Sequence, residues 1–357
     1  MENKIWHIIG LMSGTSLDGV DLVYVKFSKK DVYVFEILEK ESVNYSEKWK
    51  NTLQAAFDFS GEKLTKLDVD YGGFLGELIN EFIVKKKIKN IDFIASHGHT
   101  IFHQPELNYT LQIGSGAVIA AETNCKVICD FRIQDVALNG QGAPLVPIGD
   151  KLLFSDYDFC LNLGGFANIS FEDKDQRVAF DICPVNIVLN HYTRQIGLEY
   201  DDKGALAAQG EINDALFNVL NGLPFYKYDQ PKSLGYEFVA ATVLPKIEAF
   251  KLPLNTVLKT FIEHVAFQIS EVINRNVTMA NGNVLVTGGG AYNEYLIERI
   301  SKYSDVEIMV PDKDIIDFKE ALIFAFLGLL KDNNEVNCLQ SVTGAMRDHS
   351  SGVVFEF

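Results

Sequence analysis

Apolar and polar residues alternate along several short stretches of the first half of the chain, and this period of two predicts β-strands. Two of the stretches flank a polar, glycine-containing turn at residues 12–19. Other stretches repeat their apolar positions at the spacing of a helix. The predicted strands are residues 5–11, 20–27, 32–38, 93–95, 111–113 and 127–130, and the predicted helices are 47–57, 74–86 and 117–123. This mixture indicates an α/β protein.

The second half of the chain opens with the same order of strand, glycine turn and strand. Its predicted strands are 159–163, 167–171, 178–180 and 284–286, and its predicted helices are 211–220, 237–250, 256–277 and 294–302. This recurrence suggests an ancestral duplication, and therefore two lobes. We expect residues 1–130 and a C-terminal return at 341–357 in the first lobe, and residues 131–340 in the second.

Composition and charge limit the class of protein further. The length of 357 residues exceeds one typical domain, and a hydrophobic fraction of 47% suits a globular core. A net charge of −16 disfavours nucleic acid as a partner. No stretch approaches the ~20 apolar residues of a membrane span. Five cysteines, an odd number, favour a reducing compartment. We therefore expect a cytoplasmic protein with no membrane partner.

The first glycine turn, residues 12–21, has the composition of an anion-binding loop. Its glycines and hydroxyl residues allow several backbone N–H groups to point at one anion. Asp18 and Asp21 would repel a bare phosphate, so they suit a triphosphate only if Mg²⁺ lies between. The loop lacks the Gly-Lys-Ser/Thr of a P-loop. A solvated hairpin turn is the alternative interpretation.

Three histidines, His97, His99 and His103, follow the predicted strand at 93–95. Three imidazoles so close together could bind Zn²⁺. Alternatively, His97 and Thr100 could form hydrogen bonds to a substrate, or the rings could simply pack in the fold. No second Cys/His group completes a convincing metal site.

Arg132 lies in a segment that continues into the glycine-bearing stretch 139–144, which includes Gln141. An arginine holds a carboxylate with two parallel hydrogen bonds, so a carboxylate-bearing ligand would suit this position. A surface ion pair with Asp130 or Asp135 is the alternative.

In the second half, Asp181 directly follows a predicted strand and precedes a helix. A carboxylate there could act as a rigidly held general base, or it could cap the helix. The neighbouring glycine turns are Gly164-Gly165 and Gly288-Gly289-Gly290. Three consecutive glycines allow the backbone to approach a flat ligand such as adenosine.

Taken in order, these motifs resemble those of the anhydro-N-acetylmuramic acid kinases. The matching segments are GLMSGTSLDGVD (10–21), ASHGHTIFHQP (95–105), DFR (130–132), NGQGAPLVP (139–147), LNLGGFANIS (161–170), PKSLGYE (231–237), VTGGGAYN (286–293), KEALIFAFL (319–327) and SVTGA (341–345). The resemblance implies a two-lobed, actin-like (ribonuclease H-like) ATPase fold with ATP and Mg²⁺ in a central cleft.

The resemblance also implies a reaction and a set of site residues. The 1,6-anhydro bridge is hydrolysed while O6 is phosphorylated, which gives N-acetylmuramic acid 6-phosphate in cell-wall recycling, and Asp181 falls on the family's catalytic aspartate. The implied ATP-binding residues are Gly14, Thr15, Ser16, Leu17, Asp18, Gly19, Val20, Asp21, Gly164, Gly165, Gly288, Gly289, Gly290 and Asn293, with Asp18 and Asp21 serving Mg²⁺. The implied substrate-binding residues are His97, Thr100, Arg132, Gln141 and Glu320.

This chain departs from the family pattern at several positions. Ile182-Cys183-Pro184-Val185-Asn186 replaces the usual Thr-Gly-Pro-Gly/Ala-Asn, which removes a hydroxyl and a glycine. His99, Tyr236 and Asn139 stand where Gln, Arg and Gly are usual. Three hypotheses therefore stay open: the anhydro-sugar kinase, a kinase for another sugar, and an ATP-binding module without small-molecule turnover. A homodimer is also left open.

Overall fold

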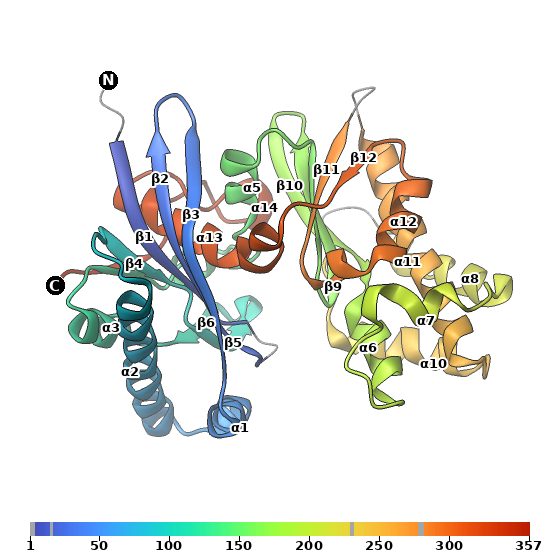
Figure 1. Ribbon diagram of the computed structural model, residues 1–357, viewed down its shortest axis with the longest axis horizontal. Coiled ribbons are helices and arrows are strands. Elements are labelled where there is room, and N and C mark those ends of the chain that lie inside the picture. The colour runs from blue at the N-terminus through green and yellow to red at the C-terminus, as the bar shows by residue number, and fades with distance from the viewer. Residues whose placement is uncertain (1–3, 15–16, 229–231, 278–281) are drawn as a thin grey trace. The chain divides into compact units, whose positions relative to one another are not determined.

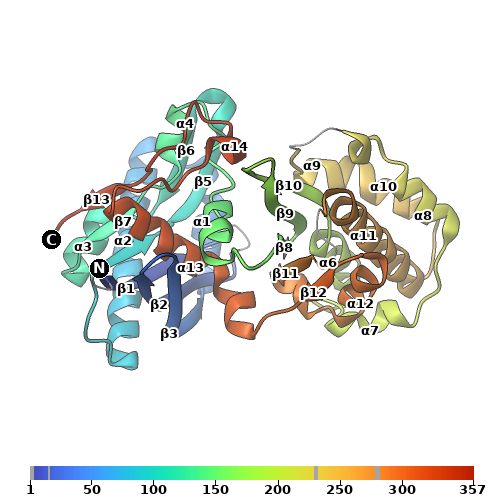
Figure 2. The same cartoon turned by 90° about the horizontal axis from the view of Figure 1, so that it is seen from above.

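The computed structural model describes residues 4–14, 17–228, 232–277 and 282–357 (Figure 1). The chain divides into two compact units. The first unit comprises Met1–Leu153 and Phe318–Phe357, and the second comprises Phe154–Asp317. The second view shows the same elements from above (Figure 2).

The first unit is built on a sheet of strand order β13-β7-β4-β1-β2-β3. Strands β1, β2 and β3 form an antiparallel meander, whereas β4 and β7 run parallel to β1. A separate hairpin joins β5 to β6. The strands are β1 (Lys4–Met12), β2 (Gly19–Lys29), β3 (Tyr33–Asn44), β4 (Phe93–Ser96), β5 (His99–Gln104), β6 (Tyr109–Ile113), β7 (Val127–Cys129) and β13 (Val353–Phe355).

Helices cover both faces of this sheet. Side chains alternate between faces along a strand, so Ile9 and Leu11 of β1 pack into a core with α2, while Gly10 faces the other way. A Cβ at Gly10 would lie 2.4 Å from the carbonyl oxygen of Ala321, so glycine permits the close approach of α13. The helices are α1 (Glu47–Ala55), α2 (Gly61–Lys86), α3 (Gly116–Thr123), α4 (Ile133–Ala137), α5 (Pro147–Leu153), α13 (Lys313–Asp332, which belongs to this unit from Phe318 on) and α14 (Gln340–Thr343).

The second unit repeats the arrangement with strand order β10-β9-β8-β11-β12. Strands β8, β9 and β10 are antiparallel, and β11 and β12 run parallel to β8. Its strands are β8 (Phe159–Leu163), β9 (Phe166–Asp173), β10 (Gln176–Pro184), β11 (Asn283–Thr287) and β12 (Glu307–Met309). Its helices are α6 (Asn186–Arg194), α7 (Ala205–Ala208), α8 (Asp214–Asn221), α9 (Tyr236–Phe238), α10 (Leu244–Glu248), α11 (Leu254–Asn276) and α12 (Glu294–Tyr303).

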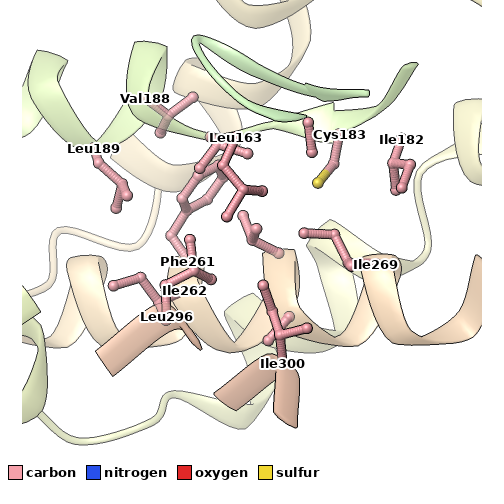
Figure 3. Close-up of a cluster of buried hydrophobic side chains, with 14 of the residues drawn as sticks. Leu163, Ile182, Cys183, Val188, Leu189, Phe261, Ile262, Ile269, Leu296 and Ile300 are labelled. Atoms are coloured by element: carbon pink, nitrogen blue, oxygen red, sulfur yellow. The ribbon is translucent and has the colours of Figure 1, made fainter. Parts of the chain in front are cut away.

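The core of the second unit lies between its sheet and α11 and α12. Figure 3 shows Leu163, Ile182 and Cys183 above Phe261 and Ile269 of α11, with Leu296 and Ile300 of α12 beside them. Burying each such large apolar side chain stabilises the fold by about 1.5–3 kcal/mol. This packing gives the strand ends and turns of the second unit a rigid base.

The repeated order, three antiparallel strands followed by two parallel ones, confirms the predicted α/β class and the duplicated actin-like arrangement. The division between the units differs from the expected boundary near residue 130. Residues 131–153 and 318–340 belong to the first unit. Within this unit, Asp135 receives hydrogen bonds from Gly142 and Thr343. The predicted helix at 237–250 is interrupted by a π-helical turn at Val239–Val243. No helix among the described residues is long and apolar enough to cross a membrane.

Candidate active site

The first glycine turn connects β1 to β2. Ser13 is buried at its start, and Leu17 adopts a left-handed backbone with φ of 60°. Asp18 is exposed, and its backbone carbonyl accepts a hydrogen bond from the amide of Tyr45. Asp21 lies opposite Met12 in the β1–β2 register. The predicted residues Thr15 and Ser16 lie outside the described residues, while Gly14 and Gly19 are half-buried and Val20 is buried in the core.

Asp21 is held by the neighbouring strand. The hydroxyl of Ser42 on β3 donates a hydrogen bond to Asp21 Oδ1 over 2.5 Å. A carboxylate fixed in this way offers a hard oxygen ligand, and such ligands suit Mg²⁺ together with retained waters. The residues present therefore fit the ion that the sequence analysis implied.

A buried chain of hydrogen bonds underlies the turn. The hydroxyl of Ser13 lies 2.6 Å from that of Tyr45, which in turn contacts the hydroxyl of Tyr71. Ser13 Oγ also lies 2.9 Å from His99 Nδ1. Burial lowers the pKa of His99 to about 4, so the ring is neutral near pH 7. His99 is therefore part of the structural support of the turn.

Arg132 and His97 form a second polar group in the first unit. Arg132 Nε donates to His97 Nε2 over 3.0 Å, and Nη1 donates to the carbonyl oxygen of Gly142 over 2.7 Å. The pKa of His97 is held well below its usual range by burial and by the Arg132 charge. Arg132 itself forms no ion pair with Asp130 or Asp135. The surface-pair alternative is therefore absent from the described structure.

Glu320 of α13 belongs to the same electrostatic neighbourhood. Desolvation raises the pKa of this carboxyl, the Arg132 charge lowers it, and the Asp21 charge raises it. The side chain is nevertheless solvent-exposed. Thr100 accepts a hydrogen bond from Gln112, and the exposed Gln141 is tied through its backbone amide to Thr343. Arg132, His97 and Glu320 are thus brought near one another, while Thr100 and Gln141 are held by separate contacts.

The three histidines do not form a metal site in the described structure. His97 pairs with Arg132, His99 with Ser13, and His103 Nδ1 lies 3.2 Å from the hydroxyl of Thr110. No metal-ligating group that includes these rings occurs among the described residues. The three side chains serve three different contacts.

Asp181 stands at a bulge near the end of β10, where the register with β9 shifts. The Leu234 amide donates to Asp181 Oδ2 over 2.8 Å, and the Asp181 amide donates to the carbonyl oxygen of Lys232. Burial raises the pKa of this carboxyl, and the Leu234 hydrogen bond opposes the rise. Helix α6 begins after Val185 with no side-chain cap, so Asp181 does not cap it.

The two glycine turns of the second unit lie side by side, because β8 and β11 are parallel neighbours. Gly288 has φ of 80° and ψ of 166°, and a Cβ there would lie 2.5 Å from Asn162 Oδ1. A Cβ at Gly290 would lie 2.6 Å from that of Leu163. In contrast, Cβ positions at Gly164, Gly165 and Gly289 meet nothing closer than 3.5 Å. These three glycines leave open backbone that a ligand can approach.

Asn293 follows the second of these turns. Its side chain accepts a hydrogen bond from the amide of Leu296 over 3.0 Å and so caps α12. Asn186 at the start of α6 donates to the carbonyl oxygen of Leu163. Both amides fix helix starts beside the glycine turns, a position where free backbone N–H groups favour anions.

Sequence reasoning missed two features of the site. One is the chain of hydrogen-bonded hydroxyl groups of Ser13, Tyr45 and Tyr71 beneath the first glycine turn. These three residues lie far apart in the sequence. The other is Lys232, which donates to the carbonyl oxygen of Phe225 and whose carbonyl receives the Asp181 amide. The PKSLGYE motif could have pointed to Lys232.

The repeated α/β fold, the polar residues around Arg132 and the glycine turns near Asp181 are features of a nucleotide-dependent enzyme. A sequence model described as anhydro-N-acetylmuramic acid kinase matches residues 6–356. This chain therefore belongs to the anhydro-N-acetylmuramic acid kinase family.

Individual relatives give the same result. The anhydro-N-acetylmuramic acid kinase of Haemophilus influenzae is 32% identical, with 99% of this chain and 98% of the relative covered. That of Pseudoalteromonas translucida is 35% identical, with 90% and 88% covered. Among solved structures, the activator of the 2-hydroxyisocaproyl-CoA dehydratase from Clostridium difficile with bound ADPNP matches with a TM-score of 0.46. Its identity is 13%, and 92% of this chain and 97% of that chain are covered.

Proposed function

We propose that this chain is an ATP-dependent anhydro-N-acetylmuramic acid kinase of cell-wall recycling. It hydrolyses the 1,6-anhydro bridge and phosphorylates O6, and the product is N-acetylmuramic acid 6-phosphate. The observation that carries this proposal is the placement of Asp181, a carboxyl of raised pKa fixed by the Leu234 amide at a strand bulge. A general base needs this combination of fixed geometry and raised proton affinity.

The reaction balances with Asp181 as the base. Asp181 takes a proton from a water molecule, whose oxygen forms a bond to C1 of the sugar. The C1–O6 bond breaks, and O6 forms a bond to the γ-phosphorus of ATP as ADP departs. The enzyme's remaining task is to position the reactants and stabilise charge on the phosphoryl group.

Residues of the three glycine-containing turns are the proposed nucleotide contacts. The turn at 12–21 supplies backbone amides, with Asp18 and Asp21 as ligands of Mg²⁺. Mg²⁺, when bound, neutralises phosphate charge. The open backbone at Gly164, Gly165 and Gly289 supports contact with the nucleotide. An acidic protein of net charge −16 needs such local donors to hold an anionic ligand.

Arg132 is the proposed contact for the lactyl carboxylate of the sugar. Two of its N–H groups are used by His97 and Gly142, which leaves the rest of the guanidinium to donate. His97, Thr100, Gln141 and Glu320 are the other proposed sugar contacts. We place the reaction in the cytoplasm, with no nucleic-acid partner, and a homodimer stays a possible assembly.

A kinase acting on a different sugar is the second candidate function. Ile182, Cys183 and Val185 are buried where the family usually has Thr and small residues. Their burial means that they fill the core instead of offering polar groups to a ligand. The substitutions therefore alter the surroundings of Asp181 without removing it.

One experiment separates these candidates from a non-catalytic ATP-binding protein. The purified chain is incubated with ATP, Mg²⁺ and 1,6-anhydro-N-acetylmuramic acid, and the products are followed by mass. We expect a mass gain of one water and one phosphoryl group, together with one ADP per sugar. Product from another anhydro sugar alone would support the second candidate, and nucleotide binding without any sugar product would contradict both.

A further inference from the structure

A buried group of three metal-ligating side chains lies in the first unit, apart from the residues assigned to the reaction. Asp135 of α4, Cys338 and His349 each offer one ligand atom, and these atoms all lie within 4.8 Å of one another. Asp135, Cys338 and His349 are 0%, 2% and 7% exposed, respectively. Cys338 and His349 are fixed opposite each other by a pair of backbone hydrogen bonds of 3.1 and 3.2 Å.

One ring nitrogen of His349, Nε2, lies within this group without a hydrogen-bond partner among the described residues. Its Nδ1 lies 3.1 Å from the carbonyl oxygen of Arg347, which can only accept, so Nδ1 carries a proton. Its Nε2 is buried, lies 3.5 Å from Asp135 Oδ1 and has no hydrogen-bond partner among the described residues. In the neutral ring, a lone pair therefore faces a carboxylate oxygen. That arrangement is unfavourable unless a cation lies between them.

The carboxylate of Asp135 is oriented by neighbours on both oxygens. The Gly142 amide donates to Oδ2 over 2.7 Å, and the Thr343 hydroxyl donates to Oδ1 over 2.8 Å. An ionised carboxylate has about four lone-pair sites, so these two bonds leave capacity for a metal. Hydrogen bonds that orient ligating carboxylates, and a histidine N–H donated to a backbone carbonyl, are the usual supports of a metal ligand set.

We propose that Asp135, Cys338 and His349 bind one zinc-type divalent cation, with a water molecule as fourth ligand. Thiolate, imidazole and carboxylate together select Zn²⁺ over Mg²⁺ or Ca²⁺. Metal–ligand bonds of about 2.0–2.3 Å place tetrahedral ligands roughly 3.3–3.7 Å apart. The 3.5 Å between Asp135 Oδ1 and His349 Nε2 already matches this span.

Cysteine binds a metal ion as the thiolate, so binding displaces the proton of the Cys338 thiol.

A cation here would tie the C-terminal segment to the segment that holds Arg132. Asp135 binds the Gly142 amide, and the Gly142 carbonyl accepts from Arg132. The site is therefore structural in this proposal, and its existence does not depend on the proposed kinase activity.

The test uses the full-length chain without a histidine tag, stripped with a chelator and titrated with Co²⁺, whose spectrum reports its ligands. We expect one Co²⁺ per chain, a thiolate-to-metal charge-transfer band and the visible bands of a tetrahedral site. Zn²⁺ displaces Co²⁺ and raises the Tm of the chain. Cys338→Ser and His349→Gln should each weaken Co²⁺ binding by more than about 100-fold, since loss of a supporting partner alone costs 10–100-fold.

Matched controls are Cys125→Ser and His191→Gln, at a free half-buried cysteine and a half-buried histidine outside the group. Both should keep the wild-type spectrum and affinity. Absence of the thiolate band from the wild-type chain, or its survival in Cys338→Ser, overturns the proposal. Because the wild-type titration decides the question by itself, poor folding of a variant does not leave it open. A wild-type chain that binds no Co²⁺ also overturns the proposal.

Discussion

The side chain of Arg132 donates its Nε proton to His97 Nε2 over 3.0 Å, across 35 positions of the sequence. His97 Nδ1 lies 2.9 Å from the carbonyl oxygen of Gly98, so the neutral ring carries its proton on Nδ1 and accepts on Nε2. Burial and the Arg132 charge hold the pKa of His97 well below its usual range. Arg132 is therefore fixed in orientation by a histidine that stays neutral.

Replacing Arg132 with lysine tests the proposed carboxylate contact. Lysine keeps the charge but loses the planar arrangement of donors and the bond to His97. Arg132→Lys should raise the KM for anhydro-N-acetylmuramic acid by about 10–100-fold, which corresponds to ~1.5–3 kcal/mol for a charge-assisted hydrogen bond. The KM for ATP should change little. Steady-state kinetics with each substrate varied in turn provide the measurement.

The control for this variant has two parts. Arg194→Lys, at an exposed arginine of the second unit, should leave both constants unchanged. A sugar analogue without the lactyl group should be a poor substrate that Arg132→Lys barely affects. Equal losses on the two sugars would show that Arg132 acts on structure and not on the carboxylate.

Asp181→Asn tests the general base. The amide cannot take a proton, although it can still accept the Leu234 hydrogen bond, so turnover should fall by about 10²–10⁴-fold with nucleotide affinity retained. Calorimetry with an ATP analogue measures affinity, and ADP release measures turnover. Asp173→Asn, at an exposed carboxylate of β9, serves as the control. Turnover within a few-fold of the wild-type value in Asp181→Asn would remove the base assignment.

The same carboxyl predicts a pH dependence. The base acts only when ionised, and its pKa is raised by burial. Activity should therefore fall, as the pH is lowered, at a pH above the ordinary aspartate value of about 3.9. The kcat/KM profile of the wild-type chain shows this acid limb, and Asp181→Asn should flatten it. An acid limb unchanged in the variant would assign it to another group.

The sequence predicted most strands of both units because alternation is a local property, but it missed β5, β12 and β13. Helix α2 was harder to predict, since it begins at Gly61 and the predicted helix began at residue 74. Gly72, Gly73 and charged residues weaken the apolar repeat in its first half, whereas the Ser60 cap, which accepts from the Lys63 amide, was the available signal. A pattern of apolar positions could not show this start.

The candidate site residues also include some that a local sequence pattern could predict and some that it could not. Asp181 and the glycine turns are adjacent to strand ends, so their placement could be predicted from the local pattern. The hydrogen bond between Arg132 and His97 could not be predicted in this way. The two residues follow β7 and β4, and they meet because these strands are parallel neighbours in the sheet. The observed unit boundary differs from the expected one for a related reason: Gly140 and Gly142 pack around the buried carboxylate of Asp135, a contact that the local sequence pattern does not show.

Gly288→Ala tests the close packing of the glycine turn at residues 288–290. The backbone of Gly288, with φ of 80° and ψ of 166°, is in a region that only glycine adopts readily, and a Cβ would lie 2.5 Å from Asn162 Oδ1. Gly197 has the same φ, but a Cβ there meets nothing within 4 Å. Gly197→Ala should therefore cost only ~1–2 kcal/mol of backbone strain. Gly288→Ala should cost a further ~1–3 kcal/mol and weaken ATP-analogue binding. Chemical denaturation and calorimetry measure both effects, and equal costs at the two glycines would contradict the crowding.

His99 makes the first unit sensitive to acid, and this sensitivity can be measured apart from catalysis. Burial lowers the pKa of His99 to about 4 in the folded chain, against about 6.5 when unfolded. Between these values the unfolded state binds a proton that the folded state does not, so stability falls as the pH drops below 6.5 and the loss levels off below pH 4. At pH 5 the loss from this ring amounts to about 2 kcal/mol.

Glutamine at position 99 does not titrate and can still form a hydrogen bond with Ser13, so His99→Gln should abolish this part of the acid sensitivity. The two tryptophans, Trp6 and Trp49, both lie in the first unit, so their fluorescence during urea unfolding reports on the unit that contains His99. Between pH 7 and pH 5, the variant should lose about 2 kcal/mol less than the wild-type chain. His191→Gln, in the second unit, should match the wild type in this signal. If His99→Gln loses as much stability as the wild type, the ring is already protonated in the folded chain, and the neutral pairing with Ser13 is wrong.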